Sequence, residues 1–414
     1  MWTIAALIFV IATFHRTSLG VLTKEIMVAF GVTGSLVALL SSIYFYVYAA
    51  LVIPGGVLVD SLGPRLVLTS GALLMAVGTL AMGSATHVVV LVGGRLVLAS
   101  GAAVAFVGTM KVAASWFPRD RFATVSGLTL SLGNVGALLG TVPFAAAATA
   151  IGWRSSFVVI GLATLVVSVW TWLVLVDAPE ERDRRPAAAG REGPERMGRA
   201  LRHALLGAGV VLRNRGTWPP LLTFAFLYSS WFNVLFWVVP FLRDVYGLRP
   251  ATAATYAAAI SLGLLGSAPT VGYFSDRVLK QRRRLYVGFC WAEFGAAALF
   301  VVTLGQLGLG FVWSLLFVSG VLGAGFALTY PLGREANPPE LAGVTVSVLT
   351  FCGFLGAALS QGLIGIVLDA LWEGGMTGGA RTYPLVGYRA AFGICLAFNL
   401  VAALCSQMAR EAES

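Results

Sequence analysis

Apolar residues run through this chain in twelve long stretches, separated from one another by short polar segments. A membrane core about 30 Å thick requires about 20 apolar residues for one helix to cross it. Each stretch reaches that length, so the pattern predicts twelve transmembrane helices and an all-α membrane protein. The predicted helices cover residues 2–24, 33–59, 66–85, 88–117, 122–149, 154–176, 218–245, 251–275, 285–304, 308–333, 340–371 and 385–408.

One longer polar stretch, residues 177–217, divides the predicted helices into two sets of six. We therefore expect an N-terminal six-helix bundle over residues 1–176 and a C-terminal bundle over residues 218–414, joined by a cytoplasmic linker. The later part of the linker, residues 195–215, mixes arginines with Leu and Val. This composition suits an amphipathic helix that lies on a membrane surface.

The charged residues are few and unevenly placed. Only 11% of residues are charged and 58% are hydrophobic, with a mean hydropathy of +0.86, whereas soluble proteins carry about 25% charged residues. Most of the 28 Lys and Arg residues fall in the linker and in the loops on its side. The positive-inside rule places that side in the cytoplasm, so we expect a multi-pass protein of the cytoplasmic (inner) membrane with both termini cytoplasmic. The same placement accounts for the net charge of +10 without a nucleic-acid partner.

A short charged loop occurs in each half of the chain. The first copy runs from Gly55 to Arg65 and contains Asp60, and a degenerate copy contains Asp276 and Arg277. The two aspartates are separated by about half the chain, which indicates a duplicated unit. Repeats of this kind in transporters are related by an axis along the membrane normal, with the binding site between the halves.

The first copy of the loop resembles the Gly-x-Leu-Ala-Asp-Arg-x-Gly-Arg-Lys motif of the major facilitator superfamily, although it departs from that motif at Ser61 and Pro64. The resemblance implies two pseudo-symmetric six-helix bundles that work by alternating access. It also implies that Asp60 latches the cytoplasmic side to the N-terminus of the eleventh helix, while Arg65 pairs with Asp60. The alternative is a solvated turn that sets only topology, and for Asp276 and Arg277 the two readings are equally balanced.

Four basic side chains lie inside the predicted helices of the first half, away from the helix ends. They are His15, Arg16, Arg95 and Lys111, and no Asp or Glu lies within the second to sixth helices. Intramembrane charges are costly and mark substrate pathways, so we expect a bound anion, with Arg16 as its main anchor. Alternatives remain for the others: Arg95 ties helix ends together, Lys111 snorkels to the cytoplasm, and His15 contacts a neighbouring helix or couples protons.

Aromatic and amide residues supply further candidate contacts. The superfamily resemblance places the first, fourth, seventh and tenth helices around the cavity. A segment of the fifth helix, Leu132 to Gly136, is similar to the signature of nitrate/nitrite porters, but the arginines of those porters in the second and eighth helices are missing. The candidate substrate contacts of this kind are Tyr44, Tyr48, Asn134, Trp231, Asn233, Trp237 and Tyr330.

The sequence therefore predicts a secondary active transporter for a small organic anion, with a carboxylate as the expected cargo and a proton or sodium as the expected coupling ion. Two alternatives stay open: an exporter of amphipathic or apolar compounds, with the basic residues structural, and a membrane receptor that does not transport. No nucleophile–base pair, metal-ligand spacing or nucleotide loop stands out, so we expect neither an enzyme nor a cofactor or metal. We expect a monomer in the lipid bilayer.

Overall fold

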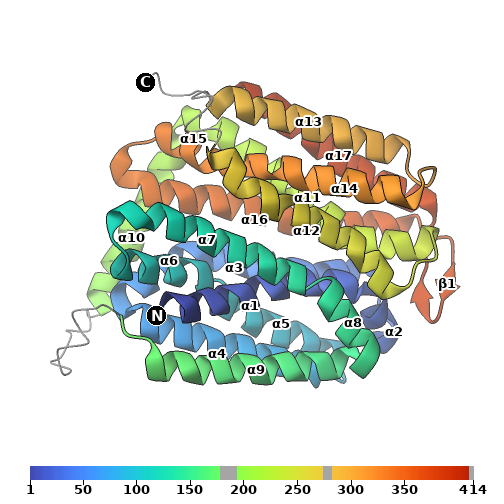
Figure 1. The fold of residues 1–414 in the computed structure, drawn as a ribbon, viewed down its shortest axis with the longest axis horizontal. Coiled ribbons are helices and arrows are strands. Elements are labelled where there is room, and N and C mark those ends of the chain that lie inside the picture. The colour runs from blue at the N-terminus through green and yellow to red at the C-terminus, as the bar shows by residue number, and fades with distance from the viewer. Residues whose placement is uncertain (178–193, 274–281, 410–414) are drawn as a thin grey trace.

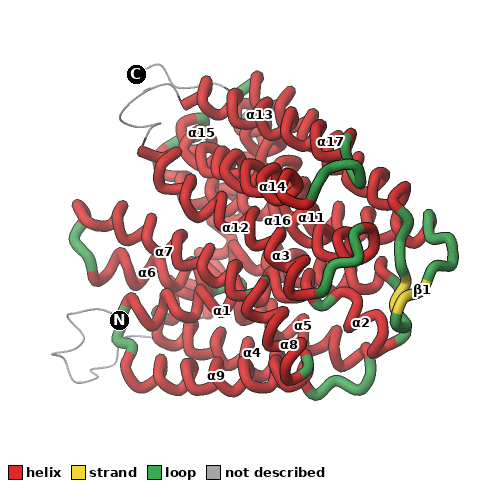
Figure 2. Tube along the Cα trace, turned by 45° about the vertical axis from the view of Figure 1, so that its right-hand side comes forward, coloured by secondary structure: helices red, strands yellow, loops and turns green. Residues whose placement is uncertain are grey.

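The computed structural model describes residues 1–177, 194–273 and 282–409, and nearly all of them are helical (Figures 1 and 2). The first half contains α1 (Trp2–Val21), α2 (Thr23–Phe30), α3 (Gly34–Leu62), α4 (Pro64–Gly83), α5 (Val88–Ala102), α6 (Ala105–Trp116), α7 (Arg119–Leu139), α8 (Val142–Ile151) and α9 (Trp153–Val174). These elements, blue to green in Figure 1, lie together below the helices of the second half.

The second half begins after α10 (Pro194–Arg213), which forms in the part of the linker where an amphipathic helix is expected. It contains η2 (Arg215–Thr217), α11 (Trp218–Val245), α12 (Pro250–Tyr273), α13 (Arg282–Val302), α14 (Leu309–Gly323), η4 (Ala324–Leu328), α15 (Thr329–Glu335), η5 (Pro339–Leu341), α16 (Ala342–Ala370), β1 (Met376–Thr377), β2 (Ala380–Arg381) and α17 (Leu385–Gln407). Within the described residues, eleven helical segments are long and apolar enough to cross a membrane. The twelfth crossing is α12, which consists largely of Ala, Gly, Ser and Thr.

Three of the predicted membrane helices are interrupted. The fourth divides into α5 and α6, the fifth into α7 and α8, and the tenth into α14, η4 and α15. In the tenth, the 3₁₀ segment η4 comes before Pro331, so the helix changes course one turn earlier than the proline alone indicates. Breaks inside membrane helices are tolerated where neighbouring helices cover the freed backbone groups.

The two ends of the helix bundle differ, and we name them by their contents. The linker end carries α10, the start of α1 and the end of α3, and the hairpin end carries α2 and the β1–β2 hairpin (Figure 1). The hairpin pairs Met376 with Arg381 in antiparallel register. Its turn residues, Gly378 and Gly379, both have positive φ, which favours glycine in tight hairpins.

The halves meet mainly along α3 and α16, which run antiparallel to each other, and further contacts join α7 and α8 to α12. Close approach at the hairpin end depends on Gly365, because a Cβ there would lie 2.7 Å from the Cβ of Ala38. In the middle of the bundle, Phe45 packs against Phe232 and Phe354, with ring centroids 4.4 and 5.4 Å away. Any site between the halves is therefore framed by α1, α3, α11 and α16.

Candidate functional site

Arg16 lies in the second half of α1 and remains partly exposed, although most of the residues around it are buried. Its guanidinium interacts electrostatically with the hydroxyl groups of Tyr44, Tyr48 and Tyr228. Among the described residues, no carboxylate forms a salt bridge with Arg16. The site therefore carries a positive charge that tyrosines surround and no described acidic side chain neutralises.

The tyrosines around Arg16 are held by ring stacking between the two halves. The ring of Tyr48 on α3 stacks on Phe354 of α16 at 4.4 Å and 18°, and it also stacks on Tyr44. Tyr228 of α11 stacks on the same Phe354 at 5.4 Å. The Tyr44 hydroxyl donates to the carbonyl of Ala12 at 2.9 Å, which fixes its ring beside α1. Stacked rings with few free rotations keep the hydroxyl groups in place around the arginine.

Several buried polar atoms near this site have no partner among the described residues. They include the indole nitrogen of Trp231 and the Nε and Nη2 atoms of Arg95. Trp231 stacks near Tyr228 and lies against Gly323, where α14 gives way to η4. Tyr330 is partly buried and interacts with both Tyr228 and Arg16. Buried donors and acceptors without partners are rare in proteins, so these atoms are candidates for contacts with a ligand.

His15 and Arg95 both lie inside the first half, and Arg95 also borders the site through Tyr44. The Nε2 of His15 lies 3.1 Å from the Thr79 hydroxyl, and its ring stacks on Phe157. Arg95 is fully buried, donates through Nη1 to the His15 carbonyl at 2.8 Å, and lies over the Tyr44 ring. Arg95 thus joins α5 to α1 while its Nε and Nη2 atoms have no partner among the described residues, so a substrate contact stays a prediction; His15 contacts α4 through Thr79.

Two expected interactions at the linker end differ in the structure. Lys111 does not reach the centre of the molecule, because its Nζ pairs with Asp60 at 2.7 Å and both side chains are largely exposed. Arg65 does not pair with Asp60 either, because its guanidinium donates to the carbonyl of Trp172 and lies over that ring. Asp60 therefore binds within its own half and does not contact the start of α16. Lys111 on α6 therefore takes the place beside Asp60 that Arg65 was expected to take.

The remaining candidates fall in different surroundings. Asn233 donates to Ser360 of α16 and to its own helix, so it serves inter-helix packing and not an open site. Trp237 is fully buried against Phe236. Asn134 is partly buried on α7. Asp276 and Arg277 lie outside the described residues.

Two residues with strong site character were missed from the sequence. Tyr228 is one turn before Trp231 on α11, and only its position opposite Arg16 distinguishes it from the other aromatic residues of that helix. Gln361 on α16 is fully buried, with neither amide atom partnered among the described residues. An amide within an apolar helix was the available signal for Gln361.

At the hairpin end, Asp369 at the end of α16 binds the start of α3. Its carboxylate accepts from the backbone amides of Gly34 and Ser35, at 3.3 and 2.8 Å. Tyr383 and Arg381 donate to the same carboxylate, at 2.6 and 3.2 Å. Helix N-termini carry partial positive charge and favour a carboxylate, so Asp369 joins the second half to the first.

Two ion pairs reinforce this closure. Lys24 on α2 binds Asp244 on α11 at 2.7 Å, and both side chains are about 95% buried. Arg243 Nη1 donates to both carboxylate oxygens of Glu25, at 2.9 and 3.1 Å. The ion pairs between the halves, and most of the hydrogen bonds between them, lie at this end in the described part of the chain. The hairpin end is therefore closed.

Burial shifts the pKa of two groups at the closed hairpin end, both of which lie outside the membrane helices. Burial raises the pKa of Tyr383 well above its usual value, so its hydroxyl stays a donor to Asp369. Burial also lowers the pKa of Lys24, while the neighbouring Asp244 opposes that change. Lys24 also donates to the backbone carbonyl of Arg381, so the amine is held by two acceptors.

The protein has two helical halves with a basic site between them, and ion pairs close one end. These features define the class of membrane carriers that expose a site to one side at a time. Within the described residues no cluster of His, Cys, Asp or Glu could hold a metal ion. A model of the Major Facilitator Superfamily matches residues 5–361. The chain belongs to this superfamily, which confirms the resemblance in the first loop.

Individual relatives share the fold and part of the sequence. The chain is 27% identical to a probable sulfoacetate transporter, SauU, of Cupriavidus necator, over 68% of this chain and 66% of that protein. It is 24% identical to the membrane sensor protein UhpC of Salmonella typhimurium, over 87% of this chain and 83% of the sensor. The structure of a bacterial homologue of the human lysosomal transporter Spinster, inward-facing and occupied, superposes with a TM-score of 0.76 at 17% identity, over 98% of this chain and 95% of that one.

Proposed function

We propose that this protein carries a small organic anion across the cytoplasmic membrane by alternating access. The observation that carries the proposal is Arg16, a partly exposed guanidinium within a membrane helix, with no carboxylate partner among the described residues. A planar guanidinium binds carboxylate, sulfonate or phosphate groups through two parallel hydrogen bonds. Tyr44, Tyr48 and Tyr228 add hydroxyl groups around it.

The relatives support an anionic cargo. One is named a sulfoacetate transporter, and others are named an L-galactonate transporter of Escherichia coli and a phosphoglycerate transporter of Salmonella typhimurium. Each of these names describes a small organic anion. The compounds share an anionic head and a short polar body, which suits one arginine inside a ring of hydroxyl and indole donors.

In this proposal residues 1–176 and 218–414 move as two bodies and residues 177–217 connect them. The linker end faces the cytoplasm, because most basic residues lie there. The closed hairpin end then faces outward, and the protein works as a monomer with a proton as its coupling ion. Arg16 contacts the cargo from the first half and Tyr330 contacts it from the second. A bound anion therefore links the two halves.

Uptake into proteoliposomes tests the cargo. Labelled sulfoacetate is the probe, with unlabelled galactonate, phosphoglycerate and a neutral sugar as competitors. Removal of a charged bidentate contact costs about 3–5 kcal/mol, so Arg16→Met should lose uptake by at least about a hundredfold. Arg249→Met is the matched control, because Arg249 is exposed at the hairpin end. Uptake that survives in Arg16→Met, or equal binding of neutral lipophilic compounds by both forms, refutes the anion proposal and favours an exporter.

The sensor relative supports a second candidate, a receptor that binds the same anion without moving it. Both candidates need Arg16, so a binding assay alone does not separate them. Isothermal titration of the purified protein, combined with the uptake assay, does. Binding with no uptake, at a protein density where a known carrier is active, identifies a sensor.

A further inference from the structure

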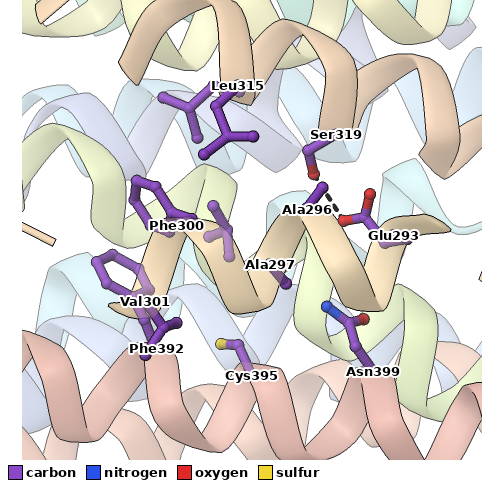
Figure 3. A pocket seen from close by; sticks show the side chains of 12 residues that line it. Glu293, Ala296, Ala297, Phe300, Val301, Leu315, Ser319, Phe392, Cys395 and Asn399 are labelled. Carbon is purple, nitrogen blue, oxygen red and sulfur yellow. Dashed lines mark hydrogen bonds between the residues drawn. The ribbon is translucent and has the colours of Figure 1, made fainter. Parts of the chain in front are cut away.

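A small cavity lies inside the second half, away from Arg16, between α11, α13, α14 and α17 (Figure 3). Its volume of about 20 Å³ is enough for one water-sized guest. Most of its wall is apolar, formed by residues such as Phe300, Leu315 and Phe392. Glu293, Ser319 and Asn399 bring oxygen atoms to this wall.

Two of these oxygens are hydrogen-bond acceptors without a partner. Glu293 is 3% exposed; its Oε1 accepts from the Ser319 hydroxyl at 2.6 Å, and its Oε2 has no partner among the described residues. Asn399 is 2% exposed, and its Oδ1 likewise has no partner there. Two buried acceptors that line one small cavity require a donor or a cation between them.

No positive side chain supplies that donor. The groups that line the cavity from α11, α14 and α17 are Val234, leucines, Ser319, Phe392, Cys395 and Asn399, and none of them carries a charge. The other titratable groups near Glu293 among the described residues are two thiols, Cys290 one turn earlier on α13 and Cys395 on α17. An ionised carboxylate with one hydrogen bond in this setting would be strongly disfavoured. Sodium would also be poorly held, because few protein oxygens face the cavity and Ser319 already donates to Glu293.

We propose that this cavity is a proton-binding site, in which the carboxyl group of Glu293 carries the proton and one water in the cavity links it to Asn399 by hydrogen bonds. Loading adds one proton from water to the carboxylate, and unloading returns the same proton to water. The proposal deepens the proposed function, since this proton is the coupling ion of the carrier.

The position of the cavity shows how protonation of Glu293 can affect the central site. Ser319 is one turn before Gly323, where α14 ends and the 3₁₀ segment η4 begins. A Cβ at Gly323 would lie 2.8 Å from the indole nitrogen of Trp231, which stacks near Tyr228. A change in the Glu293–Ser319 contact therefore acts on α14 close to its break at Gly323. That break lies next to Trp231 and Tyr228, which belong to the site around Arg16.

Infrared difference spectroscopy of the purified protein, titrated over roughly pH 5 to 10, tests the site without any substrate. We expect a protonated-carboxyl C=O band that disappears as pH rises, is absent in Glu293→Gln and shifts in frequency in Asn399→Leu. Glu340→Gln, which changes an exposed acid, should leave the band intact. A band that does not titrate identifies a static packing acid, and a band abolished by sodium at constant pH identifies a sodium site; either result overturns the proposal.

A transport measurement separates this inference from the cargo. Glu293→Gln mimics the protonated acid, so exchange of labelled for unlabelled sulfoacetate should continue at a rate within about twofold of wild type. Accumulation driven by a pH gradient should fall at least tenfold. If sulfoacetate is not a substrate, the wild-type protein shows neither exchange nor accumulation. The infrared experiment then still tests the proton site, because it needs no substrate. Accumulation that persists in Glu293→Gln refutes the coupling role.

Discussion

Asp369 holds the hairpin end closed, and its removal should open that end. The carboxylate accepts four hydrogen bonds, two of which come from the amides of Gly34 and Ser35 across the boundary between the halves. In Asp369→Asn the negative charge is lost, and the side-chain NH₂ group faces one of the amide donors. The favourable interaction with the N-terminus of α3 then becomes a repulsive one.

The size of the effect follows from the two inter-half bonds. Hydrogen bonds to a charged group contribute about 1.5–3 kcal/mol each. The Asp369 side chain keeps 16% exposure and Arg381 keeps 26%, so solvent screens part of this value. We expect a net loss of about 2–3 kcal/mol for the closed hairpin end. At about 1.4 kcal/mol per factor of ten, the equilibrium between closed and open should move roughly a hundredfold.

Distances between spin labels measure this shift. One label replaces Ile151 at the end of α8 and the other replaces Met376 in the hairpin, and both positions are more than half exposed. The four native cysteines, all free, are first replaced by serine. Asp369→Asn should add a longer distance population, whereas Asp60→Asn, which breaks a contact within one half, should not. An unchanged distribution in Asp369→Asn would show that the ion pairs alone keep this end closed.

Two other changes at the hairpin end give graded results in the same assay. Gly365→Val places side-chain atoms where Ala38 already lies 2.7 Å from an added Cβ, so we expect about 1–3 kcal/mol against closure; Gly362→Val, with open space around it, is its control. Lys24→Met leaves the buried Asp244 without its cation, which costs about 3–5 kcal/mol and should lower the thermal unfolding temperature. Adding Asp244→Asn should restore most of that stability, and failure of this rescue would count against the buried pair.

The membrane helices could be predicted from sequence because lipid imposes a single rule on every crossing. A run of about 20 apolar residues has few alternatives to a helix when no water satisfies its backbone. The breaks within the membrane helices were harder to predict from sequence. The break at η4 depends on Gly323 fitting against Trp231 from another helix, and Pro331 marked only its neighbourhood. The short α2 and the hairpin lie in loops, where hydropathy carries little information.

The site could be predicted only in part, for a related reason. Arg16 was recognisable because a charge within an apolar run is conspicuous on its own. Lys111 looked similar in sequence, yet its partner Asp60 comes from α3, and the chain alone does not reveal that contact. Asp369 and Asp244 also follow apolar runs, but their partners lie more than 100 positions away. Contacts of that kind depend on how the halves dock.

The antiparallel pair of α3 and α16 explains why one of its two terminal aspartates, Asp369, binds the other helix while Asp60 binds within its own half. Each helix ends in an aspartate that lies at the level of the other helix's N-terminus: Asp369 opposite the start of α3, and Asp60 opposite the start of α16. Phe45 and Phe354 touch midway along the pair, at 5.4 Å, so rocking about them brings one end together as the other separates. The contact that Asp369 makes therefore leaves Asp60 without its helix end, and Lys111 holds it meanwhile. In the proposed alternating-access cycle the two aspartates exchange these roles with no change in either helix, only a change in which end of the pair is closed.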